Sequence, residues 1–553
     1  MKFNFNFYIA MNNAVFSFQM PNNEPVKTYL KGSPERVELE ATLKKMRSEQ
    51  IEIPIIIGGK EIKTGNIGKV VMPSDHNHVL ATYHKVSEKE VKMAIDAAME
   101  AKKLWENVPY VERISITLRI AELIATKYRA VINASTMLGQ SKNIFQSEID
   151  AACELIDFLR FNAHFATQIY GDQPNSMNSH NNRLEYRPLE GFVFAVSPFN
   201  FTSIAGNLNL APAVMGNTTI WKPATTAILS NYYLMKVFKE AGLPDGVINF
   251  IPGQGSLIGK NILASKDLAG IHFTGSNVTF NTLWKGVGDN LDKYVSYPKL
   301  VGETGGKDFI FAHNSAYPQE LATAMVAGSF EFQGQKCSAA SRAYVPKSLW
   351  GDVKNRIFAL MDQIKMGQPY EFDVFVNAVI DEASFDNIKS YIDFAKESKE
   401  AEIVRGGVCD KSKGYFIEPT IIVTTNPKFK SMEEEIFGPV LTVYVYEDTK
   451  YEETLELCNT TSPYGLTGAI WSNDKYATLK AFDMLRYAAG NFYINDKPTG
   501  AMVGLQPFGG SRASGTNDKA GSYLNLIRWT SPRTIKETYV AATDILYGYM
   551  KEK

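Results

Sequence analysis

The sequence predicts an α/β protein with two doubly wound parallel sheets, and two observations support this fold class. Short, continuous apolar runs alternate with helical patterns at residues 192–196, 218–221, 247–251 and 270–274. Such runs are typical of strands that are buried on both faces of a parallel sheet. A second α/β pattern begins near Val301 and continues to about residue 510, which predicts a second sheet of the same kind.

The residues before the first sheet are predicted to be mainly helical. Ser33 is typical of a helix start, and Ser87 followed by Glu90 is a capping-box pattern. After a strand-like run at 53–57, apolar residues recur at helical spacing in residues 87–105, 111–128 and 147–166. Residues 183–188 alternate between apolar and polar types, which predicts an exposed strand in a hairpin arm.

The elements that follow continue the alternation of strand and helix. The pattern predicts a strand at 343–345 and helices at 230–241, 320–332 and 349–364. The last residues, 535–553, read as a strand-like, aromatic tail. Ligands bind doubly wound sheets at the carboxyl ends of the strands, so polar residues at those ends are the candidates for a site.

Composition and charge exclude several classes of function. The 58 basic and 59 acidic residues give a net charge of −1, so we expect no nucleic-acid partner and no anionic membrane surface. No apolar run approaches the ~18 residues of a membrane span. The four cysteines lack the spacing of a zinc site or a disulfide scaffold, so no metal site is expected.

Several strand ends carry polar residues. Asn200 follows the first strand, Lys222 ends the second, and the run Phe-Thr-Gly-Ser at 273–276 closes the fourth. The corner of Gly275 and Ser276 before a helix offers backbone N–H groups to an anion, and an asparagine amide can donate to an oxyanion. Taken singly, these features also fit ordinary turns and a surface lysine.

The second half of the chain adds three candidates. Glu303 lies beside a double glycine and could be a general base with a raised pKa. Cys337 is the one cysteine with small and polar neighbours on both sides, as a reachable nucleophile requires. Glu435 lies in an acidic turn at 433–439. On its own, each residue is more often structural than catalytic.

A glycine-rich run at 253–260 does not match a nucleotide-binding fingerprint. It has one residue too many for the dinucleotide pattern G-x-G-x-x-G. Gln254 and Asn261 stand where a phosphate loop needs Gly and Ser or Thr. We interpret these glycines as loop residues.

The order and spacing of the candidates are more specific than any one of them. Together they resemble the pattern of the aldehyde dehydrogenase superfamily: Asn200, Lys222, residues 273–276, Glu303, Cys337 and residues 435–437. Longer stretches resemble the Δ1-pyrroline-5-carboxylate dehydrogenases, also called L-glutamate γ-semialdehyde dehydrogenases. They are residues 23–26, 32–36, 148–150, 154–158, 197–202, 334–338, 489–496, 506–518 and 528–532.

The resemblance implies an NAD-dependent oxidation of L-glutamate γ-semialdehyde to L-glutamate, the second step of proline degradation. Cys337 would attack the aldehyde to form a thiohemiacetal, and Asn200 with the backbone N–H of Cys337 would hold the oxyanion. After hydride transfer a thioester would remain. Glu303 would then activate the water that releases the acid.

The resemblance also implies the binding residues. The cofactor would contact Ser197, Lys222, Gly275, Ser276, Glu435 and Phe437. The substrate would contact Phe199, Ser338, Gly500, Ala501, Phe508 and Glu154, with Glu154 facing the amine. Many aldehyde dehydrogenases carry a glutamate three residues after the lysine, where this chain has Thr225. NADP is therefore less strictly excluded, although NAD is the expected cofactor.

The family fold predicts four parts of the chain and an assembly. They are an N-terminal tail at 1–35, an NAD-binding domain at 36–174 and 191–301, a catalytic domain at 302–524, and an oligomerisation arm at 175–190 and 525–553. An exposed edge strand in that arm needs a partner, so we expect a homodimer or a higher homo-oligomer. Any proline dehydrogenase partner is expected to be a separate chain.

The compartment and the start of the chain are less determined. The segment 1–23 has Lys2 as its one charge, so it lacks the basic character of a mitochondrial import signal. We therefore expect a cytoplasmic enzyme, with the mitochondrial matrix as the alternative. Either Met1 or Met11 fits as the true start.

Three alternative functions stay open from the sequence. One is a dehydrogenase for another short aldehyde with a carboxylate, such as succinate semialdehyde. Another is a thioester hydrolase that uses Cys337 and Glu303 without hydride transfer. The third is a non-catalytic relative, which the intact set of Asn200, Glu303 and Cys337 disfavours.

Overall fold

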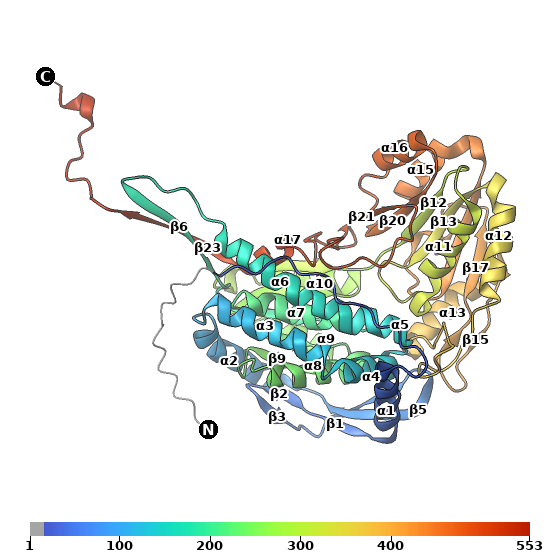
Figure 1. Cartoon of the computed structure of the whole chain (residues 1–553), viewed down its shortest axis with the longest axis horizontal. Helices are drawn as coiled ribbons and strands as arrows, with labels where there is room; N and C mark the ends of the chain where they lie inside the picture. Colours follow the sequence, from blue (N-terminus) through green and yellow to red (C-terminus); the bar gives the residue numbers. More distant parts are fainter. Residues whose placement is uncertain (1–15, 553) are drawn as a thin grey trace.

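The first of two large sheets forms the centre of the body that holds most of the N-terminal half. The computed structural model describes residues 16–552, and it contains two α/β bodies and a projecting two-stranded arm (Figure 1). The strand order is β11-β10-β7-β8-β9-β2-β3, with β11 to β9 parallel and β2 and β3 antiparallel. The strands are β2 (Ile55–Ile57), β3 (Lys60–Ile62), β7 (Phe192–Val196), β8 (Thr219–Lys222), β9 (Ile248–Phe250), β10 (Leu268–Thr274) and β11 (Lys299–Glu303).

The second sheet also has seven strands and confirms the predicted second α/β unit. Its order is β14-β17-β18-β13-β12-β20-β21, and every pair except β14 with β17 is parallel. The strands are β12 (Asp308–Ala312), β13 (Ala340–Pro346), β14 (Ala401–Arg405), β17 (Thr420–Thr424), β18 (Val440–Tyr446), β20 (Thr467–Trp471) and β21 (Asn491–Ile494).

Helices cover both sheets. The first body carries α1 (Pro34–Ser48), α2 (Glu88–Trp105), α3 (Tyr110–Ala125), α4 (Arg129–Gln140), α5 (Ile144–Ser147), α6 (Glu154–Gly171), α7 (Thr202–Val214), α8 (Ile228–Glu240), α9 (Gly255–Leu263) and α10 (Asn277–Gly288). The second carries α11 (Pro318–Phe330), α12 (Lys347–Met361), α13 (Glu382–Glu397), α14 (Lys430–Glu433), α15 (Tyr451–Thr460) and α16 (Lys475–Met484). The predicted caps at Ser33 and Ser87 are confirmed. Within residues 16–552, no helix combines the length and apolar character of a membrane span.

The prediction of one strand at 53–57 is wrong. Pro54 divides the run into β1 (Ile51–Ile53) and β2, which belong to different sheets. A proline has no N–H to donate to a ladder, so it favours such a break. β1 instead pairs with β5 (Asp75–His84), which also pairs with β4 (Ile67–Met72).

Two predicted helices differ from the structure in a way that matters for the site. The run 147–166 is a short helix, then a π-helix over Glu148–Cys153, then α6. The helix expected at 320–332 ends at Phe330, because Phe332 and Gln333 adopt left-handed backbone with φ of 49° and 55°. π-Turns and strained non-glycine residues both occur preferentially at functional sites.

The arm is a two-stranded ribbon that leaves the bodies and ends near the C-terminus (Figure 1). β6 (His180–Arg187) pairs antiparallel with β23 (Ser531–Thr538) along their whole length. The prediction of a local hairpin is wrong for β6, because its partner is the distant strand β23. The strand-like reading of 535–553 is wrong after Thr538, since residues 539–552 contain no strand.

The predicted segment boundaries are not all observed at element ends. β11 extends to Glu303 and so crosses the expected boundary at 301–302. The short helix α17 (Tyr523–Leu526) crosses the one at 524–525. The expected tail at 1–35 overlaps α1, because residues 34 and 35 already belong to that helix. Residues 1–15 lie outside the described part of the chain, and they include both candidate start methionines, Met1 and Met11.

Candidate active site

Four neighbouring parallel strands bring the predicted residues of the first body to one edge. Lys222 ends β8, Ser197 follows β7, Gly275 follows β10, and Glu303 ends β11. The register places Val196 beside Lys222 and Thr274 beside Glu303. Residues that are up to about a hundred positions apart in the sequence therefore meet at the carboxyl edge of the sheet, as the doubly wound fold requires.

The Cys337 loop is held in an unusual backbone by side-chain hydrogen bonds. Gln333 donates through Nε2 to the carbonyls of Ser141 at 3.0 Å and Ala378 at 2.9 Å. Gly334 has φ of 66°, and a Cβ there would lie 2.2 Å from the carbonyl oxygen of Gly438. Surroundings that fix left-handed residues in this way are typical of preorganised sites.

Asn200 contacts this loop but does not line the main cavity. Its Nδ2 donates to the carbonyl oxygen of Gln335 at 3.0 Å, two residues before Cys337. The amide thus lies beside the cysteine loop, as the sequence predicts. In this arrangement one of its two N–H groups supports the loop, which leaves the other as the candidate oxyanion donor.

A cavity of about 300 Å³ collects the catalytic candidates and most of the substrate candidates. Those that line it are Cys337, Glu303, Ser338, Gly500, Ala501, Phe508 and Glu154. Phe201 lines the cavity and Phe199 does not, so the substrate contact of Phe199 stays a prediction. Phe199 instead packs edge-on against Phe437, with 5.7 Å between ring centroids.

A smaller cleft lies on the other side of the cysteine. Glu435, Phe437 and Cys337 all line it, and Cys337 is shared with the large cavity. Glu435 accepts a hydrogen bond from the backbone N–H of Gly306 at 2.9 Å. Cys337 therefore lies between the large cavity and this smaller cleft and lines both of them.

The acid–base state of the site follows from desolvation. Burial raises the pKa of Glu303 from 4.5 to about 8, and a lysine nearby, Lys519, opposes the shift. Its Oε1 is enclosed and has no hydrogen-bond partner among residues 16–552. Burial also raises the pKa of the Cys337 thiol, and the charge of Glu303 adds to that effect. A carboxyl group that is poised near neutral pH beside a protonated thiol is suited to general-base catalysis.

Glu154 is another buried carboxyl group at the cavity. Burial raises its pKa to about 8, and its Oε2 accepts a hydrogen bond from the hydroxyl of Ser203 at 2.5 Å. It follows the π-helix, whose Asp150 forms an ion pair with Lys142 at 2.6 Å. Lys336, the neighbour of Cys337, lies 3.8 Å from the same carboxylate.

The cofactor candidates separate into two groups. Glu435 and Phe437 line the small cleft, and burial raises the pKa of Glu435 to about 7. Ser197, Lys222, Gly275 and Ser276 line neither cavity. Ser197 accepts a hydrogen bond from the Trp221 indole at 2.9 Å, and Ser276 caps α10.

Sequence reasoning missed several lining residues. Lys519 is the lysine that acts on Glu303, and Thr499 exchanges a hydrogen bond with Ser338 at 2.8 Å. Lys519 directly follows the family-like run that ends at Asp518, so a charged residue at that place could have been singled out. Phe201 carries no such signal, since its neighbour Phe199 has the same chemistry.

Cys337 lines both cavities, the buried carboxyl group of Glu303 lines the larger one with it, and α10 begins at the edge of a parallel sheet. This arrangement fits a thiol-dependent enzyme that oxidises aldehydes. Residues 62–535 match the model of the aldehyde dehydrogenase family, to which this chain belongs. Within that family the chain belongs to the Δ1-pyrroline-5-carboxylate dehydrogenases, because relatives that carry this name are about half identical to it over almost their whole length.

The relatives cover nearly the whole chain. A mitochondrial Δ1-pyrroline-5-carboxylate dehydrogenase of Dictyostelium discoideum is 55% identical over 534 residues, which are 96% of this chain and 96% of that protein. The human mitochondrial protein of the same name is 48% identical over 530 residues, 96% of this chain and 94% of its own. A Mycobacterium tuberculosis enzyme of this name, solved with NAD, is 49% identical with a TM-score of 0.94, and the match covers 98% of this chain and all of that one.

Proposed function

We propose that this aldehyde dehydrogenase oxidises L-glutamate γ-semialdehyde, the open form of Δ1-pyrroline-5-carboxylate, to L-glutamate with NAD. The reaction is the second step of proline degradation. The observation that carries the proposal is the cavity of about 300 Å³, in which Cys337, Glu303, Gly500 and Ala501 converge. The names of its relatives, and the NAD bound to the mycobacterial enzyme, support the same reaction.

The chemistry begins at Cys337. The carboxylate of Glu303 accepts the proton of the Cys337 thiol and passes it on to solvent, and the sulfur attacks the aldehyde carbon, which forms a thiohemiacetal. The free N–H of the Asn200 amide and the backbone N–H of Cys337 stabilise the negative oxygen. Bound NAD would supply the hydride acceptor that this adduct needs to become a thioester.

Glu303 completes the reaction. As a carboxylate it removes a proton from a water molecule, and the hydroxide attacks the thioester carbon, which releases L-glutamate and the thiolate of Cys337. The cavity wall around Glu303 raises its pKa to about 8. The group can therefore both accept and return a proton near neutral pH.

The residues present fit NAD. The ammonium of Lys222 has no hydrogen-bond or ion-pair partner within residues 16–552, and burial lowers its pKa, which suits a donor to ribose hydroxyls. Glu435 offers a carboxylate for the other ribose, and Phe437 lies at the cysteine end of the cleft. Gly275 and Ser276 lie at the start of α10, where backbone N–H groups favour a pyrophosphate. Thr225 leaves room for the weaker use of NADP.

The substrate's two charged groups have separate partners in this proposal. Ser338 and the backbone N–H groups of Gly500 and Ala501 hold the α-carboxylate, with Gly500 at φ of 97°. Phe508 packs against the aliphatic chain. Glu154 faces the α-ammonium group, whose positive charge would lower the pKa of that carboxyl group again.

The proposal extends to domains and assembly. Residues 36–174 and 191–301 form the NAD-binding domain, residues 302–524 the catalytic domain, and residues 175–190 with 525–553 the oligomerisation arm. Within residues 16–552 the ribbon of β6 and β23 pairs with no third strand, and strand edges of this kind pair with another copy. We therefore propose a homodimer or larger homo-oligomer that works with a separate proline dehydrogenase.

For the compartment, the cytoplasm remains our proposal and the mitochondrial matrix the alternative. The names of the Dictyostelium and human relatives support the matrix. Fusion of residues 1–35 to a fluorescent protein decides between them, because import would carry the reporter into mitochondria.

The first experiment follows reduced NAD by absorbance with Δ1-pyrroline-5-carboxylate and, separately, with succinate semialdehyde. We expect a far higher kcat/KM for the first. Preference for succinate semialdehyde would keep the enzyme class and overturn the substrate. Acid release without reduced NAD would instead indicate a thioester hydrolase.

A further inference from the structure

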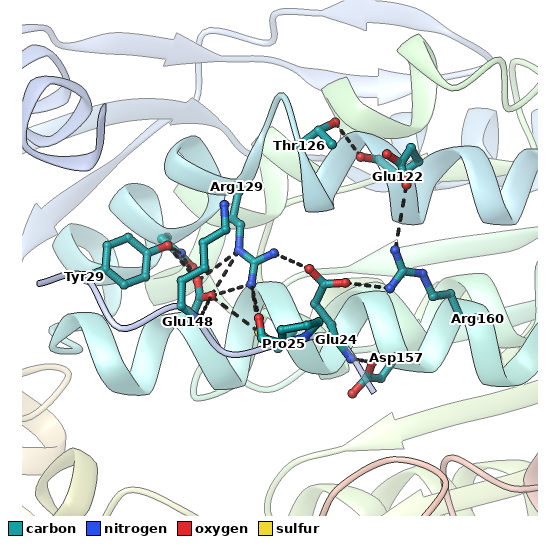
Figure 2. Close-up of polar contacts among 12 residues, drawn as sticks. Glu24, Pro25, Tyr29, Glu122, Thr126, Arg129, Glu148, Asp157 and Arg160 are labelled. Carbon is teal, nitrogen blue, oxygen red and sulfur yellow. Dashed lines mark hydrogen bonds and ion pairs between the residues drawn. The ribbon is translucent and has the colours of Figure 1, made fainter. Parts of the chain in front are cut away.

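A strap of N-terminal residues, Asn23 to Tyr29, runs alongside the π-helix and α6, and polar contacts with Glu148, Asp157 and Arg129 bind it there (Figure 2). Arg129 forms ion pairs with Glu24 of the strap and with Glu148 of the π-helix, both at 2.5 Å. Arg160 on α6 pairs with the second oxygen of Glu24 at 2.6 Å. The side chains of Arg129 and Glu148 are 4% and 0% exposed, so the network is internal to the fold.

Backbone and hydroxyl groups of the strap complete the network. Glu148 accepts hydrogen bonds from the N–H of Lys27 at 2.9 Å and from the hydroxyl of Tyr29 at 2.8 Å. Arg129 donates to the carbonyl of Pro25 at 2.9 Å. Removing one partner from a set of paired buried charges is costly, so these contacts favour the observed position of the strap.

The strap touches the substrate cavity directly. Glu24 and Val26 both line the cavity of about 300 Å³ that contains Cys337. Asp157 of α6 also lines this cavity, and its Oδ1 accepts a hydrogen bond from the backbone N–H of Glu24 at 2.7 Å. The N-terminal segment therefore forms part of the wall of the catalytic cavity, although more than 300 residues separate it from the cysteine.

Asn23 links this fixed strap to the loop that carries Gly500 and Ala501. Its Nδ2 donates two hydrogen bonds, one to Oδ2 of Asp157 and one to the carbonyl oxygen of Val503, both at 2.8 Å. Val503 lies three residues after Gly500 and also lines the cavity. One amide thus uses both of its N–H groups to join α6 to the loop.

We propose that Asn23 is a positioning and specificity residue, which holds the 500–503 loop where its backbone N–H groups can bind the substrate's α-carboxylate. This inference rests on the proposed function. Asn23 does not touch the reacting atoms and acts through the loop. Loss of the Asn23 side chain should therefore weaken the binding of substrates that carry an α-carboxylate and leave the binding of aldehydes without one unchanged.

The test compares two substrates and two single variants, Asn23→Ala and Asn23→Asp, in the full chain. Asn23→Asp keeps the size of the side chain but removes both donors. We expect either variant to raise KM for L-glutamate γ-semialdehyde about tenfold, with kcat within about twofold of wild type. KM for an uncharged aldehyde of similar length, pentanal, should stay within about twofold of its wild-type value.

Asn22→Ala is the matched control. Asn22 is the exposed neighbour of Asn23, and its side chain makes no hydrogen bond within residues 16–552. It should leave both KM values unchanged. An equal rise for both aldehydes in the Asn23 variants, or no rise for either, would overturn the inference. If wild type itself fails to oxidise the semialdehyde, the proposed function fails instead, so the two failures are distinguishable.

Discussion

Two buried glutamates of the first body, Glu148 in the π-helix and Glu303 at the end of β11, have pKa values that are shifted in opposite directions. Glu148 accepts hydrogen bonds from the Lys27 backbone, from Tyr29, from Asn133 and from Arg129, and these partners hold its pKa below 4.5. Glu303 leaves Oε1 without a partner within residues 16–552, and burial raises its pKa to about 8. The same side chain is a fixed anion in one place and a titrating base in the other.

The difference shows how burial and pairing together divide structural carboxylates from catalytic ones. Both groups lose contact with water, which disfavours charge. Donors around Glu148 more than offset that loss, whereas Lys519 offsets it only in part for Glu303. We therefore expect substitutions at Glu303 and its neighbours to change the reaction rate, and substitutions at Glu148 and its partners to change the free energy of unfolding.

The largest effect should come from Cys337→Ala. Loss of the nucleophile prevents the thiohemiacetal, so the formation of reduced NAD should fall by about 10⁴-fold or more. Cys409→Ala is the control, since Cys409 is also a half-exposed free cysteine but lines neither cavity. Activity that survives in Cys337→Ala would contradict the proposed mechanism. The assignment of Glu303 as the catalytic glutamate and Glu148 as the structural one would then lose its basis.

Glu303→Gln should lower kcat by about 10² to 10⁴-fold, because the base that activates water is lost. Wild-type kcat should rise with pH through about 8, since the carboxylate form is the base and its pKa is raised from 4.5 to about 8. The residual activity of the variant should lack this step. Rates measured from pH 6 to 9.5 provide the check, and a step near 8 that persists in Glu303→Gln would assign it to another group.

The sequence predicts much of the arrangement around Glu303. The strand that ends at Glu303 and the glycines after it are local features, and parallel-sheet topology then brings such strand ends together. Cys337 was likewise marked by its small polar neighbours. What could not be foreseen was the left-handed backbone at Phe332 and Gln333, which depends on carbonyls of Ser141 and Ala378 that are distant in sequence.

The sequence predicts little of the structure around Glu148. Periodicity at 147–166 predicts one helix, because a π-turn shifts the register by a single residue and leaves the apolar spacing almost unchanged. The N-terminal strap has no periodic pattern, so its residues read as a tail. Pro54 shows a related limit: a run of isoleucines looks like one strand, although tertiary pairing places its halves in two sheets.

Glu148→Gln should destabilise the fold by about 3 to 5 kcal/mol, because it leaves the buried Arg129 with one carboxylate instead of two. Glu452→Gln is the matched control. Glu452 pairs with Lys480 at 2.9 Å, but both side chains are about half exposed, and such pairs contribute roughly 0 to 1 kcal/mol. Urea unfolding followed by tryptophan fluorescence measures both. Equal midpoints for the two variants would contradict the assignment of Glu148 to structure.

The smallest effect should come from Tyr29→Phe, which removes one hydroxyl from the network and keeps the ring. Tyr29 is 5% exposed, and its hydroxyl donates to Glu148 and accepts from Asn133 at 2.9 Å. Loss of these bonds should cost about 1 to 3 kcal/mol, since Glu148 and Asn133 stay buried with fewer partners. The removal of one donor should also raise the pKa of Glu148, yet kcat at pH 8 should not change. A fall in kcat without a fall in stability would mean that the fixed anion, like Glu303, takes part in the chemistry.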